Sequence, residues 1–166
     1  GFKLTNDQNN AVDEINKDIS SNERMFRLLQ GDVGSGKTIV SLISAQNVIL
    51  NNYQVAFMAP TEILAKQHFV LFKKIFGNVS KIEFLTGKTE NKKRKDILKK
   101  LENNEINIIF GTHSLFQKKI KFKNLGLIIV DEQHKFGVNQ RKKLSEKGDS
   151  NCDVLVMSAT PIPRTM

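Results

Sequence analysis

The sequence predicts a single α/β domain, built on a mainly parallel, twisted sheet with helices on both faces. Three observations support this. Short apolar runs alternate with helical patterns along the whole chain, and strands joined by helices form parallel sheets covered on both sides. The chain has 166 residues, 39% of them hydrophobic, which suits one domain with a core. The polar motifs follow apolar runs, as they do where ligands bind at the carboxyl ends of parallel strands.

The elements follow one another in a regular order. Thr5 can cap a first helix reaching about Ile19, with Val12, Ile15 and Ile19 at helical spacing. Six strands are expected at Met25–Leu29, Gln54–Met58, Lys81–Leu85, Ile106–Phe110, Leu125–Val130 and Val154–Met157. Helices are expected between most of them, at Ile39–Leu50, Glu62–Phe76, Glu90–Glu102 and roughly Asn139–Glu146.

Charge and cysteine content narrow the function classes. The net charge of +9 suggests a polyanionic partner such as nucleic acid, although a merely solvated lysine-rich surface gives the same number. The basic run Asn91–Lys100 has the same two interpretations, and we favour a solvated helix face that packs Ile97, Leu98 and Leu101 inward. One cysteine, Cys152, allows no internal disulfide, which fits a reducing cytosol, and we expect it to be buried. No apolar run is long enough to span a membrane.

Residues 31–38 read Gly-Asp-Val-Gly-Ser-Gly-Lys-Thr and match the phosphate-loop pattern. In such a loop the glycines let backbone N–H groups surround a phosphate chain, and the following helix adds its positive end. The expected nucleotide contacts are Gly31, Gly34, Ser35, Gly36, Lys37 and Thr38. Lys37 would reach the β- and γ-phosphates and the Thr38 hydroxyl would bind Mg²⁺. An ordinary glycine-rich turn is the alternative, but the apolar run before the motif and the helical pattern after it favour nucleotide binding.

A second motif supplies carboxylates. The apolar run Leu127–Val130 ends in Asp131 and Glu132, where a strand tip would hold both acids rigidly. Beside a phosphate loop, Asp131 is expected to hold Mg²⁺, and Glu132 to orient and deprotonate the attacking water. A strand followed by a charged turn is the alternative. Gln133 and His134 follow at once, and a histidine there is either a surface residue or a sensor of nucleotide state.

The tetrad Asp-Glu-Gln-His after a phosphate loop resembles superfamily 2 helicases, whose remaining motifs occur in the same order. The longer matches at 59–68, 111–113, 131–141 and 159–165 resemble the RecG family of bacterial ATP-dependent DNA helicases. The resemblance implies a RecA-like fold, ATP and Mg²⁺ as cofactors, a bacterial cytoplasmic location, and a strand at Val154–Met157 lying between the other two nucleotide-site strands. Lys135, Ser114 and Ser158 depart mildly from the family pattern.

The resemblance also assigns roles to residues. Phe2, Leu4 and Gln8 correspond to the segment that reads adenine. Motifs Ia, Ib and Ic would contact the sugar–phosphate backbone of branched duplex DNA, independent of sequence, through Thr61, Thr86, Gly87, Thr112 and His113. His134, Ser158 and Thr160 would couple hydrolysis to movement, with Lys37, Asp131, Glu132 and His134 serving catalysis.

The domain is expected to be one RecA-like motor domain over residues 1–166, excised from a larger protein that also carries a wedge domain and a second motor domain. Because the family's arginine finger comes from that second domain, the isolated domain is expected to turn over little ATP. Three alternatives stay open: the motor of a transcription–repair coupling factor or another superfamily 2 translocase, a phosphate-loop ATPase acting on protein partners, and a module that only binds.

Overall fold

The computed structural model describes residues 4–20, 26–30, 36–117, 119–131 and 152–158. The described strands are β1 (Phe26–Gln30), β2 (Gln54–Met58), β3 (Ile82–Leu85), β4 (Ile108–Gly111), β5 (Leu125–Asp131) and β6 (Asp153–Ser158). The described helices are α1 (Asn6–Ser20), α2 (Lys37–Leu50), α3 (Glu62–Phe76), α4 (Asn91–Glu102) and the 3-10 turn η1 (His113–Phe116). Each predicted strand overlaps an observed one, while the helix expected near 139–146 lies outside the described residues.

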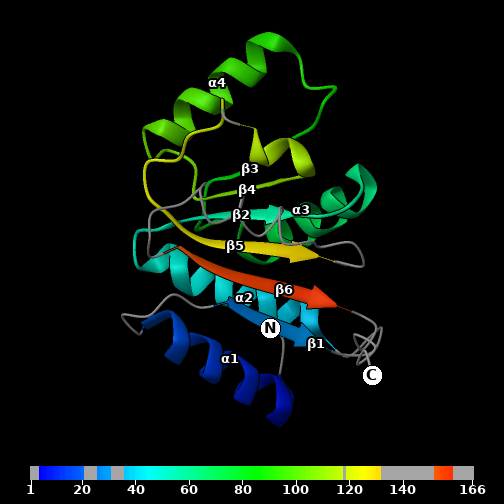
Figure 1. The fold of residues 1–166 in the computed structure, drawn as a ribbon, viewed down its shortest axis with the longest axis vertical. Coiled ribbons are helices and arrows are strands. Elements are labelled where there is room, and N and C mark those ends of the chain that lie inside the picture. Colours follow the sequence, from blue (N-terminus) through cyan, green and yellow to red (C-terminus); the bar gives the residue numbers. More distant parts are fainter. Residues whose placement is uncertain (1–3, 21–25, 31–35, 118, 132–151, 159–166) are drawn as a thin grey trace, which may run out of the picture.

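The six strands form one parallel sheet in the order β1-β6-β5-β2-β4-β3. All strand arrows therefore point to the same edge (Figure 1). β6 lies between β1 and β5, as the family resemblance predicted. Parallel strands that all end at one edge bring residues far apart in sequence to that edge.

One face of the sheet packs against α1, α2 and α3. Alternate strand residues such as Val55 and Phe57 point to this side, where they join Ile15, Leu42 and Phe72 in one buried cluster. Strand side chains alternate between faces, so the two neighbours in β2, Ala56 and Met58, belong to the opposite cluster. Sheet and helices thus bury apolar surface on both sides, which is the main stabilising contribution to such a fold.

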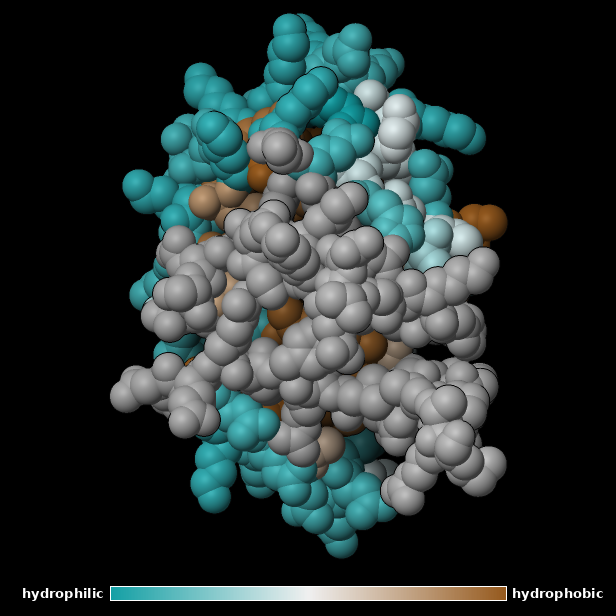
Figure 2. Space-filling view, viewed as in Figure 1, coloured by the Kyte–Doolittle hydropathy of each residue, from teal (hydrophilic) through white to brown (hydrophobic). Residues whose placement is uncertain are grey.

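The opposite face carries α4, where the basic run lies. Ile97 and Leu101 are 1% exposed and Leu98 packs partly against the same cluster, so the predicted inward packing is confirmed. The lysines of α4 are exposed, and hydrophilic side chains cover this helix at the top of the molecule (Figure 2). Asp96 and Lys100 form a pair one turn apart with an N–O distance of 3.1 Å, which supports the helix. Cys152 is buried as predicted.

The edge at the amino ends of the strands is tied together by Gln54. Its buried side chain donates to the carbonyls of Leu101 and Ile106, at 3.0 and 2.9 Å, and accepts from the N–H of Asn124 at 2.9 Å. One amide therefore satisfies three backbone groups from three segments. The role of Gln54 at this edge of the sheet is to stabilise the fold. No helix among the described residues is long and apolar enough to cross a membrane.

Candidate functional site at the strand ends

The N-terminus of α2 directly follows Gly36, the last glycine of the predicted phosphate loop. Gly36 precedes the helix with φ +83°, a left-handed conformation that favours glycine. Lys37 and Thr38 form the first turn and are half-buried. This turn contains no acidic residue, so no carboxylate of its own competes for the positive helix end. Gly31, Gly34 and Ser35, also expected to contact nucleotide, lie outside the described residues.

The side chain of Gln8 lies against Gly36 at the start of α2. Thr5 and Gln8 form a reciprocal cap of α1, in which Thr5 N–H donates to Gln8 Oε1 at 2.9 Å and Gln8 N–H donates to Thr5 Oγ1 at 3.1 Å. The other end of the Gln8 amide fits over Gly36, where an added Cβ would lie 1.8 Å from Nε2. Leu4 packs partly against the core below, and Phe2 lies outside the described residues. Of the predicted adenine-reading segment, Gln8 is therefore adjacent to Gly36 and the N-terminus of α2.

Asp131 ends β5 at the same edge, with only 4% of its surface exposed. Its Oδ2 lies 2.6 Å from Nε2 of His68, which comes from α3. The other predicted carboxylate, Glu132, and His134 lie outside the described residues. Ser158 ends β6 opposite Gln30 of β1, while Thr160 falls outside. Within the described residues, the structure thus brings Gly36, Lys37, Thr38 and Asp131 to one edge.

The loop after β2 leads into α3, where Thr61 is the N-cap. Its Oγ1 accepts from the N–H of Leu64 at 3.2 Å. Because a hydroxyl also has one hydrogen to donate, this cap still leaves a donor for a phosphate oxygen. Thr61 is exposed, and its contact with DNA stays a prediction.

The loop after β3 is built around Thr86, which is 8% exposed. Its Oγ1 accepts from the N–H of Lys88 at 3.1 Å, and its N–H donates to Thr89 Oγ1 at 3.0 Å. The guanidinium of Arg94 donates to the Thr86 carbonyl. The predicted DNA contact through the Thr86 hydroxyl stays a prediction, but in this geometry the hydroxyl shapes the loop. Gly87 and Lys88 are the exposed residues that it presents.

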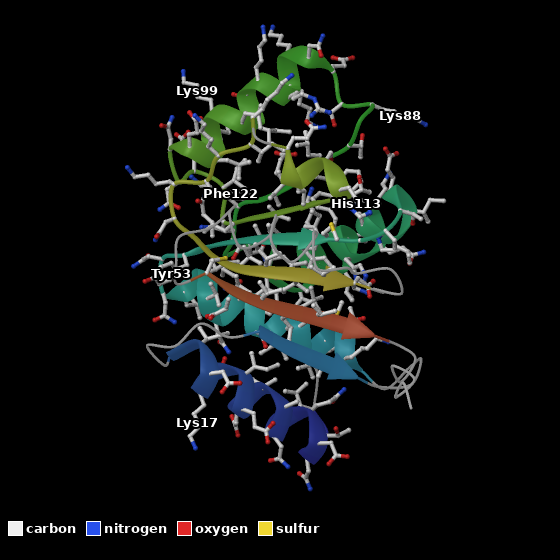
Figure 3. The ribbon with its side chains drawn as sticks, in the orientation of Figure 1. Lys17, Tyr53, Lys88, Lys99, His113 and Phe122 are labelled. Atoms are coloured by element: carbon white, nitrogen blue, oxygen red, sulfur yellow. The ribbon has the colours of Figure 1, made fainter. Side chains whose placement is uncertain are left out.

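β4 ends at Gly111, and the loop after it begins with Thr112. An added Cβ on Gly111 would lie 2.8 Å from the Leu85 carbonyl oxygen, so the strand end must be a glycine for β3 and β4 to approach. Thr112 precedes η1 and is half-buried, and His113 is exposed. His113 and Lys88 lie on the side to which the strands point (Figure 3).

Strand order divides this edge into two halves. β1, β6 and β5 carry the predicted nucleotide groups, and β2, β4 and β3 carry the three predicted DNA loops. The boundary falls between β5 and β2, which pair with Met58 opposite Val130. Our prediction from sequence missed the contact that crosses this boundary, between His68 and Asp131. A polar residue at a buried position of an amphipathic helix is the signal that marks His68.

Comparison with known proteins shows the family to which the chain belongs. The family model of the DEAD/DEAH box helicases matches residues 5–166. The chain belongs to this helicase family. Among curated proteins, it is 52% identical over 165 residues to the ATP-dependent DNA helicase RecG of Staphylococcus epidermidis and 51% identical to that of Staphylococcus aureus. Both matches cover 99% of the chain and 24% of the relative, so the chain spans about a quarter of the length of these relatives. The predicted resemblance to RecG is confirmed.

Solved structures are similar to this chain in fold. A RecG bound to a three-way DNA junction is 44% identical with a TM-score of 0.82, covering 99% of this chain and 22% of that one. The UvsW helicase from bacteriophage T4 is 19% identical with a TM-score of 0.70, covering 96% of this chain and 53% of that one, which supports the fold alone. The predicted RecA-like α/β fold is confirmed.

Proposed function

We propose that this chain is the ATP-binding motor domain of a RecG-type DNA helicase or translocase, which remodels branched DNA and stalled replication forks in recombination and repair. The observation that carries the proposal is the divided strand edge, with a phosphate-loop helix and a buried aspartate on one half and three polar loops on the other. Support for branched DNA comes from the 44% identical RecG bound to a three-way junction. A domain that consumes ATP and acts on bacterial DNA works in the cytoplasm.

The nucleotide half suits ATP with Mg²⁺. The left-handed Gly36 and the N-terminus of α2 would hold the phosphates, with Lys37 neutralising their charge. The described residues contain no cluster of three His, Cys, Asp or Glu side chains that could hold a metal alone. That fits Mg²⁺, which binds through one or two protein oxygens plus phosphates and water. Thr38 and Asp131 would supply those oxygens, and bound Mg²⁺ would neutralise charge on the phosphates. Glu132 would activate the attacking water.

The DNA half suits backbone contact. Thr61, Thr112 and the Thr86–Lys88 turn present hydroxyls, backbone N–H groups and a lysine, with Gly87 and His113 beside them. These groups bind phosphate and sugar, which positions a protein on DNA without reading sequence. A motor that must move along any sequence requires that mode. Ser158, Thr160 and His134 would transmit the nucleotide state to these loops.

The rest of the proposed machine would lie in other domains of the same protein. A second motor domain would supply an arginine finger, which contributes roughly 10³ to 10⁵ in rate, and a wedge domain would split the fork. The isolated domain would therefore bind nucleotide and turn over little of it. ATPase rates measured with and without the second motor domain would show whether this domain hydrolyses ATP alone or only binds it.

The test of the nucleotide assignment uses two variants of the full-length gene product. Lys37→Ala should abolish ATP binding in a calorimetric titration while the thermal melting curve stays that of a folded protein. Glu132→Gln should bind ATP like the parent and lose most DNA-stimulated hydrolysis, because only the water-activating group is lost. Parental affinity in Lys37→Ala, or parental turnover in Glu132→Gln, would show that the assignment is wrong.

A further inference from the structure

We propose that His68 is a positioning residue of the ATP site, which holds the carboxylate of Asp131 in the orientation that Mg²⁺ requires. This inference rests on the proposed function, since it takes Asp131 as an Mg²⁺ ligand. His68 would act through Asp131 and would touch neither nucleotide nor metal.

The contact itself is short and sheltered. His68 Nε2 and Asp131 Oδ2 are 2.6 Å apart, and the two residues are 8% and 4% exposed. As an Mg²⁺ ligand, the Asp131 carboxylate would only accept hydrogen bonds, so the ring nitrogen of His68 would be the donor. Hydrogen bonds of this kind to a charged group are shorter and stronger than neutral ones, and water screens this pair little.

The imidazole is itself fixed. Its ring lies 4.7 Å from that of Phe57, centroid to centroid, and Phe57 is fully buried on β2, where it stacks on Phe110 at 5.1 Å. α3 starts at the Thr61 cap, and the ring is carried by the second turn of this helix. Packing and helix register therefore determine where Nε2 points, and with it where Oδ2 is held.

A metal ligand benefits from such a partner. Ligating carboxylates are usually hydrogen-bonded by a further shell of residues, and losing one of these partners typically costs 10- to 100-fold in metal affinity or activity. Mg²⁺ tolerates little departure from octahedral geometry, so a carboxylate that rotates binds it less well. The hydrogen bond from His68 would keep the Asp131 carboxylate from rotating in this way.

The pair also joins the two halves of the strand edge. Asp131 ends β5 in the nucleotide half, whereas His68 lies on α3, whose first residues follow the Thr61 loop in the DNA half. His68 is seven positions beyond Thr61, which is roughly 10 Å along a rigid helix. A single helix thus carries both a predicted DNA contact and the donor to the predicted Mg²⁺ ligand.

The experiment measures binding rather than turnover. In the full-length gene product, the affinity of a fluorescent, non-hydrolysable ATP analogue is titrated against Mg²⁺ for His68→Leu, His68→Asn and His68→Gln. The amide nitrogen of glutamine can reach the place of Nε2, whereas that of asparagine is one methylene short. Val70→Ala, an exposed change on the same helix, is the matched control.

We expect the Mg²⁺ concentration for half-maximal binding to rise 10- to 100-fold in His68→Leu and His68→Asn, and less than about threefold in His68→Gln and Val70→Ala. Affinity measured without Mg²⁺ should be unchanged throughout. Parental Mg²⁺ dependence in His68→Asn, or a loss in His68→Gln equal to that in His68→Asn, would overturn the inference. If His68→Leu does not fold, the comparison of His68→Asn with His68→Gln still tests the inference. A parent that binds no analogue at any Mg²⁺ concentration would instead overturn the proposed function.

Discussion

Gly36 is the described residue at which backbone geometry makes the strongest demand on the side chain. Its φ of +83° lies in the left-handed region, and the space for a Cβ is occupied by the Gln8 amide. We predict that Gly36→Ala costs about 1–2 kcal/mol of stability through backbone strain alone. It should also weaken ATP binding at least roughly tenfold, because the phosphate-loop turn and Gln8 must both shift. Thermal melts and calorimetric titration measure the two effects.

A matched control separates strain from binding. Asn52 has φ +69° in an exposed turn at the opposite edge of the sheet, so Asn52→Ala introduces similar backbone strain far from the site. It should lower the melting temperature and leave ATP affinity unchanged. Equal affinity losses in both variants would mean that Gly36 affects nucleotide only through global stability.

At the same scale, sequence alone could identify residues whose chemistry is local. Gly36, Lys37 and Thr38 follow from one continuous motif, and Asp131 follows from a strand that ends in acids. The partnership of Asp131 with His68 could not be predicted in this way, because sheet order and helix register create it across 63 positions. The role of the Thr86 hydroxyl within its own turn likewise depends on the fold of a loop, which pattern alone does not specify.

Among the elements, α3 was predicted with its observed bounds, and the reason is a strong start signal. Thr61 caps the helix, Glu62 favours its first turn, and Lys73 and Lys74 favour its last. Strand boundaries were predicted less accurately. β4 begins at Ile108 rather than Ile106, because Ile106 is buried in the core but precedes the residues that pair with β2 and β3. The 3-10 turn η1 was not predicted, since a single short turn leaves no periodic signal.

The Thr61 cap allows helix stability and DNA contact to be separated. Thr61→Asp should keep α3 intact, because aspartate is a good N-cap and suits the positive helix end. The added negative charge should nevertheless weaken DNA binding about tenfold or more by repelling phosphate. Thermal melts and fluorescence anisotropy on a branched duplex measure these outcomes. Thr61→Ser, which keeps cap and hydroxyl, should match the parent in both, and tight DNA binding by Thr61→Asp would remove Thr61 from the contact surface.

For the whole molecule, the distribution of the +9 charge would decide how the proposed DNA partner binds. Each phosphate that a lysine neutralises contributes about 0.9 to the slope of log affinity against log salt. Lys88 is exposed in the loop after β3 at the strand-end edge, and Lys99 is exposed on α4, away from that edge (Figure 3). We predict that Lys88→Gln lowers the slope by about 1 and weakens binding to all sequences alike. Lys99→Gln should leave the slope unchanged.

Comparing Lys88→Gln with Lys99→Gln is informative because each change removes one exposed positive charge from the same domain. A net-charge effect acting at a distance would shift both variants equally, and only a direct phosphate contact distinguishes them. Anisotropy titrations of the full-length protein at several salt concentrations, on junctions of unrelated sequence, provide the two slopes. If Lys99→Gln lowers the slope as much as Lys88→Gln, the effect is one of net charge, and the prediction that Lys88 contacts a phosphate directly is wrong.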